Sequence, residues 1–110
     1  MKVGIDIVEV HRIERLIKNK AFLEKIYTKE EIKYCSGKKN KGQHFAVRFA
    51  AKEAVWKALM EKNVTHKDIG VKNLVNGRPE VFIKGKKRNN IDISLSHTKE
   101  HAVACAIIGK

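Results

Sequence analysis

Two carboxylates stand inside segments that are otherwise apolar, and their type and position suit chemistry more than packing. Glu53 interrupts RFAAKEAVWKAL (residues 48–59), which as a helix is apolar around nearly its whole circumference. Asp6 lies in GIDIV, a β-branched run in which aspartate is depleted. Because an isolated carboxylate in a core is costly, each needs a partner or a metal ion. Ordinary alternatives are that Glu53 pairs with Lys57 one turn on, and that Asp6 faces solvent from an edge strand.

The donor set formed by these two carboxylates suits a hard cation. Carboxylate oxygens, completed by water and phosphate oxygens, are typical ligands of Mg²⁺, whereas Zn²⁺ prefers histidine and cysteine. The sequence therefore predicts a magnesium site made by Asp6 and Glu53, provided that the fold brings the strand and the helix together.

Basic and hydroxyl side chains stand where phosphate groups would need them. Arg48 and Lys52 are four residues apart on the same expected helix, and an anion between them would turn their repulsion into attraction. The segment SHTKEH adds Ser96, His97 and Thr98 at a strand end, although a structural role is the commoner alternative for a lone histidine. The sequence contains neither of the glycine-rich phosphate-binding fingerprints, GxxxxGK[ST] and GxGxxG.

Charge is the strongest feature of the composition. The 110 residues include 24 basic and 12 acidic side chains, a net charge of +12 that predicts an anionic partner. That partner could be a nucleic acid, an anionic surface, a phosphorylated small molecule or an acidic protein. The length predicts one domain over residues 1–110. The sequence has two isolated cysteines, and we expect neither a membrane span nor a signal peptide, so it predicts a reduced, cytoplasmic protein.

The hydrophobic periodicity predicts an α+β domain with one long buried helix and C-terminal antiparallel strands packed on it. The expected elements are a strand over 2–10, a helix over 11–26, a short helix with a capping box at Thr28 and Glu31 that Gly37 ends, a long helix from about His44 to Met60, two strands within 68–85 around an Asn76-Gly77 turn, and strands over 90–96 and 101–108.

Three of these segments together resemble a known family. The chain resembles the holo-[acyl-carrier-protein] synthases, the small trimeric class of 4′-phosphopantetheinyl transferases. The resemblance lies in GIDIVEVHRI (4–13), RFAAKEA (48–54) and ISLSHTKEHAVA (93–104), and NGRP (76–79), between the last two segments, also matches. The resemblance covers essentially the whole chain and implies that family's fold. It also implies a reaction: the phosphopantetheine arm of coenzyme A moves onto a serine of an apo acyl carrier protein, and 3′,5′-ADP is released.

The resemblance assigns roles to individual residues. It implies that Asp6 and Glu53 bind Mg²⁺, that Arg48 and His97 hold the 3′-phosphate end of coenzyme A, and that Lys57 lies near the pyrophosphate. The expected coenzyme site is completed by Lys52, Ser96 and Thr98. The expected catalytic residues are Asp6, Glu53 and Lys57. The implied assembly is a homotrimer with active sites at the subunit interfaces, and the base that deprotonates the serine stays open among Asp6, Glu53 and a metal-bound water.

The first helix carries the expected surface for the acidic carrier protein. Arg12, Arg15 and Lys18 lie opposite its apolar stripe, and the resemblance gives Arg12 the docking role. A solvated basic face without a partner is the ordinary alternative. The rival functions are a nucleic-acid-binding module using GKKNKGQ (37–43) and KGKKRNN (84–90) as phosphate contacts, and a scaffolding protein in an acidic assembly. Neither rival accounts for Asp6 and Glu53, so we expect no nucleic acid and no membrane as partner.

Overall fold

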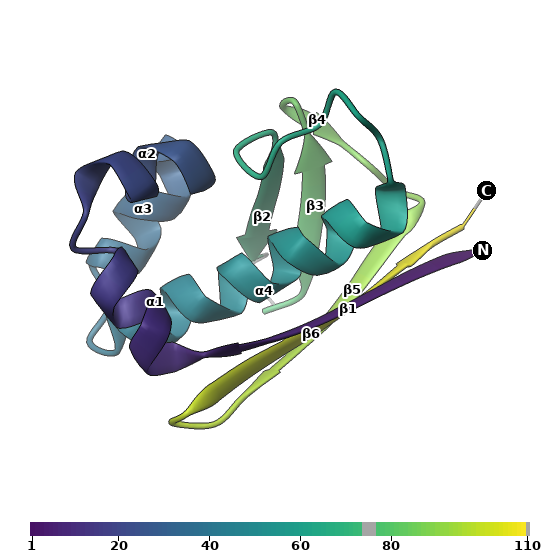
Figure 1. Cartoon of the computed structure of the whole chain (residues 1–110). Coiled ribbons are helices and arrows are strands. Elements are labelled where there is room, and N and C mark those ends of the chain that lie inside the picture. The colour runs from purple at the N-terminus through teal and green to yellow at the C-terminus, as the bar shows by residue number, and fades with distance from the viewer. Residues whose placement is uncertain (74–76, 110) are drawn as a thin grey trace.

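The computed structural model describes residues 1–73 and 77–109 and shows an α+β fold built around one long helix. In chain order the elements are β1 (Lys2–Glu9), α1 (Val10–Leu16), α2 (Lys20–Ile26), α3 (Lys29–Ser36), α4 (Lys41–Leu59), β2 (Ile69–Asn73), β3 (Pro79–Ile83), β4 (Lys86–Lys87), β5 (Ile91–His97) and β6 (His101–Ile108). In Figure 1, α1, α2 and α3 gather at the end where α4 begins, and β1 starts beside the end of β6 at the opposite end.

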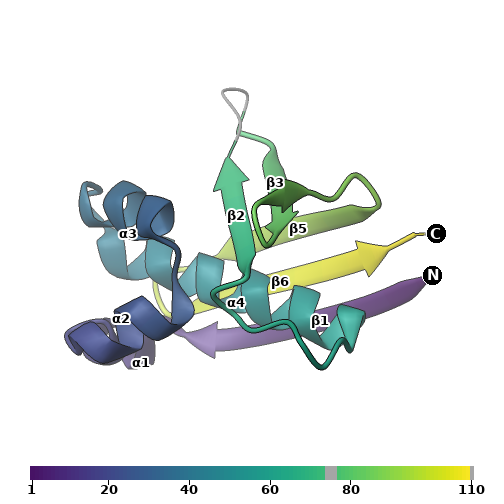
Figure 2. The ribbon, with the colours of Figure 1, turned by 90° about the horizontal axis from the view of Figure 1, so that it is seen from above.

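The strands form two antiparallel sheets on different sides of α4. One has the order β1-β6-β5, with Gly4 opposite Ala106 and Asp6 opposite Ala104, and the other has the order β2-β3-β4. Figure 2, seen from above, shows the strands of the second sheet rising away from the first. The first strand of the chain thus joins the last two, a pairing between segments about a hundred residues apart in sequence that local patterns do not specify.

Helix α4 fills the centre of the core. Most of its side chains are buried, which confirms the long buried helix predicted from the sequence. Strand β1 approaches it so closely that a Cβ on Gly4 would lie 1.9 Å from the carbonyl oxygen of Ala54. Glycine at this position therefore lets the strand that carries Asp6 lie directly on the helix that carries Glu53.

Most of the predicted elements are confirmed, with two differences. The helix expected over residues 11–26 is two helices, because Asn19 caps α2 by accepting from the Phe22 amide at 3.2 Å. The short strand β4 was not expected. The predicted capping box of α3 is present, with Thr28 and Glu31 each accepting from the other's backbone amide. The strands on either side of the predicted Asn76-Gly77 turn do pair, but Asn76 itself lies outside the described residues.

Candidate active site

Asp6 and Lys57 meet where β1 crosses α4. Along β1 the residues that face α4 are Gly4, Asp6 and Val8, because Gly4 and Val8 are buried and Asp6 is 16% exposed. The Lys57 ammonium lies 3.2 Å from Asp6 Oδ1 and donates at 3.1 Å to the carbonyl of Ile5. The strand therefore presents its single aspartate to the helix and not to open solvent.

Glu53 has a different partner from the one that its sequence neighbours suggest. Its Oε1 lies 2.9 Å from Nε2 of His66, in the loop after α4, and the two side chains are 24% and 22% exposed. Lys57, the partner considered in the sequence, is engaged by Asp6 instead. Glu53 and Lys57 are one helical turn apart on the same face of α4, and Lys57 reaches Asp6 on β1, so we call this helix face together with Asp6 the β1–α4 border.

This border has the chemistry for a hard divalent cation. Two half-buried carboxylates on rigid elements supply two oxygen ligands, and their exposure leaves room for water and phosphate oxygens. Within the described part of the chain, no cluster of three or more histidine, cysteine or acidic side chains could hold a metal by itself. The residues present therefore fit an ion such as Mg²⁺ that is shared with a substrate, and do not fit an all-protein cage.

Lys52 lies on the same helix but is not available to a ligand. Its side chain is fully buried, with its ammonium 2.6 Å from Glu31 Oε1 and donating to the carbonyls of Ile69 and His66. These contacts use all three of its donors. Burial lowers the pKa of Lys52, and the Glu31 carboxylate opposes that shift. This geometry argues against the predicted phosphate-binding role and makes Lys52 a structural residue that ties α4 to α3 and to the loop before β2.

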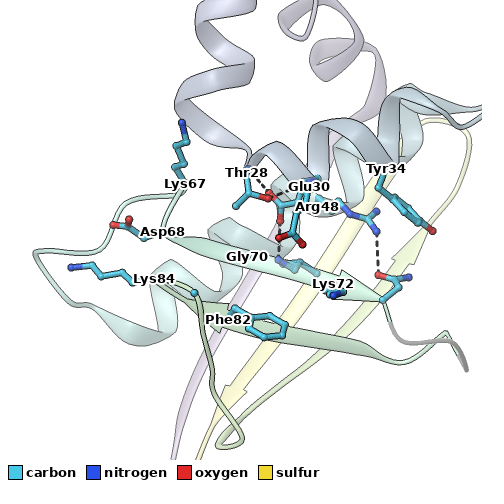
Figure 3. A pocket seen from close by; sticks show the side chains of 14 residues that line it. Thr28, Glu30, Tyr34, Arg48, Lys67, Asp68, Gly70, Lys72, Phe82 and Lys84 are labelled. Carbon is cyan, nitrogen blue, oxygen red and sulfur yellow. Dashed lines mark hydrogen bonds between the residues drawn. The ribbon is translucent and has the colours of Figure 1, made fainter.

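Arg48 is buried but sits between two hollows. Its guanidinium is 4.5 Å from the centre of the Tyr34 ring and donates at 3.2 Å to the side chain of Asn73. Figure 3 shows it between Tyr34 and the β2 strand, at the edge of a pocket of about 430 Å³. Its Nε is buried without a hydrogen-bond partner among the described residues. The side chain is thus held in place with part of its donor capacity unused.

His97 lies across a second pocket from Arg48. This pocket has a volume of about 520 Å³ and is lined by the start of α4, the end of β2, the start of β3 and the end of β5. His44, which the sequence did not single out, lies in the same pocket. Burial lowers the pKa of His44, as do the positive charges of Arg48 and Lys38. The pocket thus holds one fixed cation and two imidazoles, a combination that suits a phosphate group.

The remaining predicted residues lie at the surface. Thr98 closes the β5–β6 turn, its hydroxyl accepting from the amides of Glu100 and His101 at 3.2 and 3.1 Å, and Ser96 is exposed on β5. The side chains of Arg12, Arg15 and Lys18 are exposed, as expected, and none of them forms an ion pair within the described residues.

The predicted site residues form two groups in one chain. Asp6, Glu53 and Lys57 lie along the border between β1 and α4, whereas Arg48 and His97 line the pocket near the start of that helix. Glu53 lies five positions after Arg48, which places the two residues about 140° apart around the helix axis. The two groups of residues therefore face different directions around α4.

The amino-acid sequence matches a family model over nearly its whole length. Residues 2–106 match the model described as the 4′-phosphopantetheinyl transferase superfamily. The chain belongs to this family. Among curated relatives, the holo-[acyl-carrier-protein] synthase of Thermodesulfovibrio yellowstonii is 46% identical over 96% of each chain, and that of Chloroherpeton thalassium is 41% identical over 98% of this chain and 97% of its own. The enzyme class and family predicted from the sequence are confirmed.

Solved structures of phosphopantetheinyl transferases share the fold. A holo-(acyl-carrier-protein) synthase from Bacillus anthracis in complex with CoA (3′,5′-ADP) superposes with a TM-score of 0.84 at 36% identity, over 97% of this chain and 94% of the other. The Helicobacter pylori synthase in complex with coenzyme A gives a TM-score of 0.82 at 28% identity, over 97% and 99%. The predicted α+β fold is thus confirmed. Within the described residues, none of the helices has both the length and the apolar character to span a bilayer.

Proposed function

We propose that this phosphopantetheinyl transferase moves the 4′-phosphopantetheine group of coenzyme A onto a serine hydroxyl of an apo acyl carrier protein. The serine oxygen forms a bond to the β-phosphorus of the coenzyme's pyrophosphate, and the bond from that phosphorus to the bridging oxygen breaks. The serine hydroxyl passes its proton to a base, which is Asp6, Glu53 or a water molecule, and 3′,5′-ADP leaves with the bridging oxygen. The observation that carries this proposal is the carboxylate–lysine border of Asp6, Glu53 and Lys57, in a chain whose curated relatives are named holo-[acyl-carrier-protein] synthases.

The border residues have complementary roles in this reaction. Asp6 and Glu53 would hold Mg²⁺, which would neutralise charge on the phosphate oxygens as the phosphorus–oxygen bond breaks. Lys57 is 48% exposed, so its ammonium can leave Asp6 for a phosphate oxygen and stabilise charge on the departing phosphate. Transfer of this kind depends mainly on positioning and charge neutralisation, and both carboxylates project from a packed strand and a packed helix.

The second pocket is the proposed place of the coenzyme's 3′-phosphate. Arg48 offers a buried guanidinium already oriented by Tyr34 and Asn73, and His97 and His44 add imidazole donors. A phosphate there would meet a preformed site, so little side-chain entropy is lost on binding.

We propose that the β1–α4 border and the Arg48 pocket are two half-sites, which are joined between subunits of a homotrimer. The outer face of the β1-β6-β5 sheet leaves Val3, Ile5 and Ile7 60–65% exposed and Ile107 40% exposed. Val3 lies opposite Ile107 in the register, so these side chains form one continuous apolar surface that solvent would not favour. The trimer is the assembly implied by the family resemblance, and it would let the carboxylates of one subunit meet the Arg48 pocket of the next.

Mixed assemblies provide a test of this sharing. A Glu53→Gln chain and a His97→Ala chain are each expected to be nearly inactive. When subunits are exchanged between the two, some interfaces would pair the intact half-site of each, so activity would return. Mixed trimers that remain as inactive as their parents would contradict the shared site.

The proposed second substrate is an acidic carrier protein. Exposed basic side chains at positions 12, 15 and 18 follow directly on β1, the strand that carries Asp6, so a carrier docked on α1 would bring its serine toward the carboxylate border. Complementary charge of this kind sets association rate and partner choice, and salt screens it. The two cysteines are free, one of them buried, which favours the reducing cytoplasm.

The reaction is tested by following 3′,5′-ADP release. Coenzyme A and Mg²⁺ should yield 3′,5′-ADP only when an apo carrier protein with its acceptor serine is present, and a serine-to-alanine carrier should give none. The nucleic-acid rival predicts no release with either carrier, together with salt-sensitive binding to random DNA.

A further inference from the structure

His66 occupies a slot made by the same helix face that carries Glu53. Phe49 lies one turn before Glu53 and Trp56 one turn after it. The imidazole lies between these two rings, with ring centres 6.2 Å from Phe49 and 5.8 Å from Trp56 and planes inclined by only 11° and 22°. These two near-parallel aromatic neighbours restrict the plane of the imidazole, and its Nε2 edge meets Glu53.

The loop that carries His66 is fastened to α4 at several points. The buried Lys52 ammonium donates to the His66 carbonyl at 3.1 Å, and the Trp56 indole donates to the carbonyl of Val64 at 3.1 Å. Within the loop, Asp68 accepts from both the amide and the hydroxyl of Thr65. The position of His66 is therefore set by the buried core and not by the exposed surface.

We propose that His66 is a positioning residue, which holds Glu53 Oε1 through its Nε2–H so that the other carboxylate oxygen remains available to the catalytic metal ion. This inference rests on the proposed function, because it assumes that Glu53 binds the metal. A carboxylate only accepts hydrogen bonds, so the 2.9 Å contact requires Nε2 to carry the hydrogen. No hydrogen bond to Oε2 of Glu53 occurs among the described residues, which leaves that oxygen free for the ion.

The physical effect of this contact is to remove rotamers that Glu53 would otherwise adopt. A half-exposed glutamate on a helix samples several side-chain conformations, and each unproductive one lowers the apparent affinity for the ion. Hydrogen-bond partners of metal ligands typically change metal affinity by about 10–100-fold when they are removed. The role also explains why Lys52 is buried: it anchors the loop that orients the metal ligand.

Two substitutions separate the hydrogen bond from the packing. His66→Phe keeps a ring between Phe49 and Trp56 but removes the donor, whereas His66→Gln keeps an N–H donor at the position of Nε2 and loses the ring. Lys67→Gln, at the next and exposed position of the loop, is the matched control. Binding of Mn²⁺ to the protein–coenzyme A complex, measured from the electron paramagnetic resonance signal of free Mn²⁺, reports the metal site without requiring turnover.

The expected result is a dissociation constant for Mn²⁺ raised about 10-fold or more by His66→Phe, and changed by less than about threefold by His66→Gln. Lys67→Gln should leave it unchanged, and the affinity for coenzyme A without metal should be the same in all four proteins. Parent-like Mn²⁺ affinity of His66→Phe would overturn the proposal. A loss in His66→Gln as large as that in His66→Phe would overturn it too, because it would show that an N–H donor at this position does not preserve the metal site. A parent protein that binds Mn²⁺ but never modifies a carrier would refute the proposed function alone.

Discussion

Replacing Lys52 by methionine tests whether this residue stabilises the fold or binds phosphate. The substitution keeps a long apolar side chain and removes the ammonium that contacts Glu31, Ile69 and His66. Glu31, only 4% exposed, would then be a buried carboxylate without its cation.

The expected loss of unfolding free energy follows from that orphaned charge. Removing one partner of a buried ion pair typically costs about 3–5 kcal/mol. Glu31 still accepts from the amides of Thr28 and Val71 at 2.9 and 2.8 Å, and these bonds stabilise its charge. We therefore expect a loss at the lower end of this range, about 3 kcal/mol. This is a large share of the free energy of unfolding of a typical domain, roughly 5–15 kcal/mol. The double variant Lys52→Met/Glu31→Gln should lose less than the sum of its single changes, because the two sites are coupled.

Urea unfolding followed by fluorescence measures this loss. Trp56 is the only tryptophan, and its indole is hydrogen-bonded to the loop that Lys52 anchors. Lys33→Met, at an exposed position of α3, is the control and should change stability by less than about 0.5 kcal/mol. A Lys52→Met protein that loses less than about 1 kcal/mol but binds coenzyme A much more weakly would refute our reasoning and restore the phosphate-binding role.

Three further predictions concern the framework of the site. Gly4→Ala should cost about 3 kcal/mol or more, because its Cβ would collide with the Ala54 carbonyl, and a chain with parental thermal stability would contradict the close approach of β1. Coenzyme A binding should take up a proton near pH 6.5, because burial lowers the pKa of His44 in the free protein and a phosphate would raise it again. Affinity should then increase as the pH falls, and calorimetry in two buffers should detect an uptake that His44→Gln reduces. Met60→Gly should raise stability by about 0.5–1 kcal/mol in thermal unfolding, because Met60 ends α4 with φ 54° and is 82% exposed; a lower melting temperature would show that its side chain packs.

The fold was largely predictable because its local patterns agree with its global arrangement. Alternating β-branched residues, the Thr28 capping box and the apolar segment around Glu53 each determine their own element. The break between α1 and α2 was missed because the apolar stripe continues across it, and only Asn19 as a capping residue signals it. The pairing of β1 with β6 depends on a long-range contact that no local pattern encodes.

The site was predictable in its residue types but not in its contacts. Asp6 and Glu53 stood out because a charge in an apolar segment requires an explanation, and in the structure they pair with Lys57 and His66. Lys52 was predicted to bind phosphate, since a single sequence does not reveal that Glu31, twenty-one positions earlier, lies beside it in the core. His66 gave no local signal at all. Its slot becomes visible only when the loop after α4 folds back over the helix.

The intact mass of a carrier protein tests the central claim most directly. An apo acyl carrier protein is incubated with coenzyme A, Mg²⁺ and either the parent enzyme or Glu53→Gln, a change that alters charge without altering shape. We predict that the parent adds one phosphopantetheine group to each carrier, and that Glu53→Gln, with its fold intact by circular dichroism, does so at least about 100-fold more slowly. A carrier whose mass never changes with the parent enzyme would contradict the transferase function, and equal rates with both proteins would contradict the assignment of Glu53 to the metal ion.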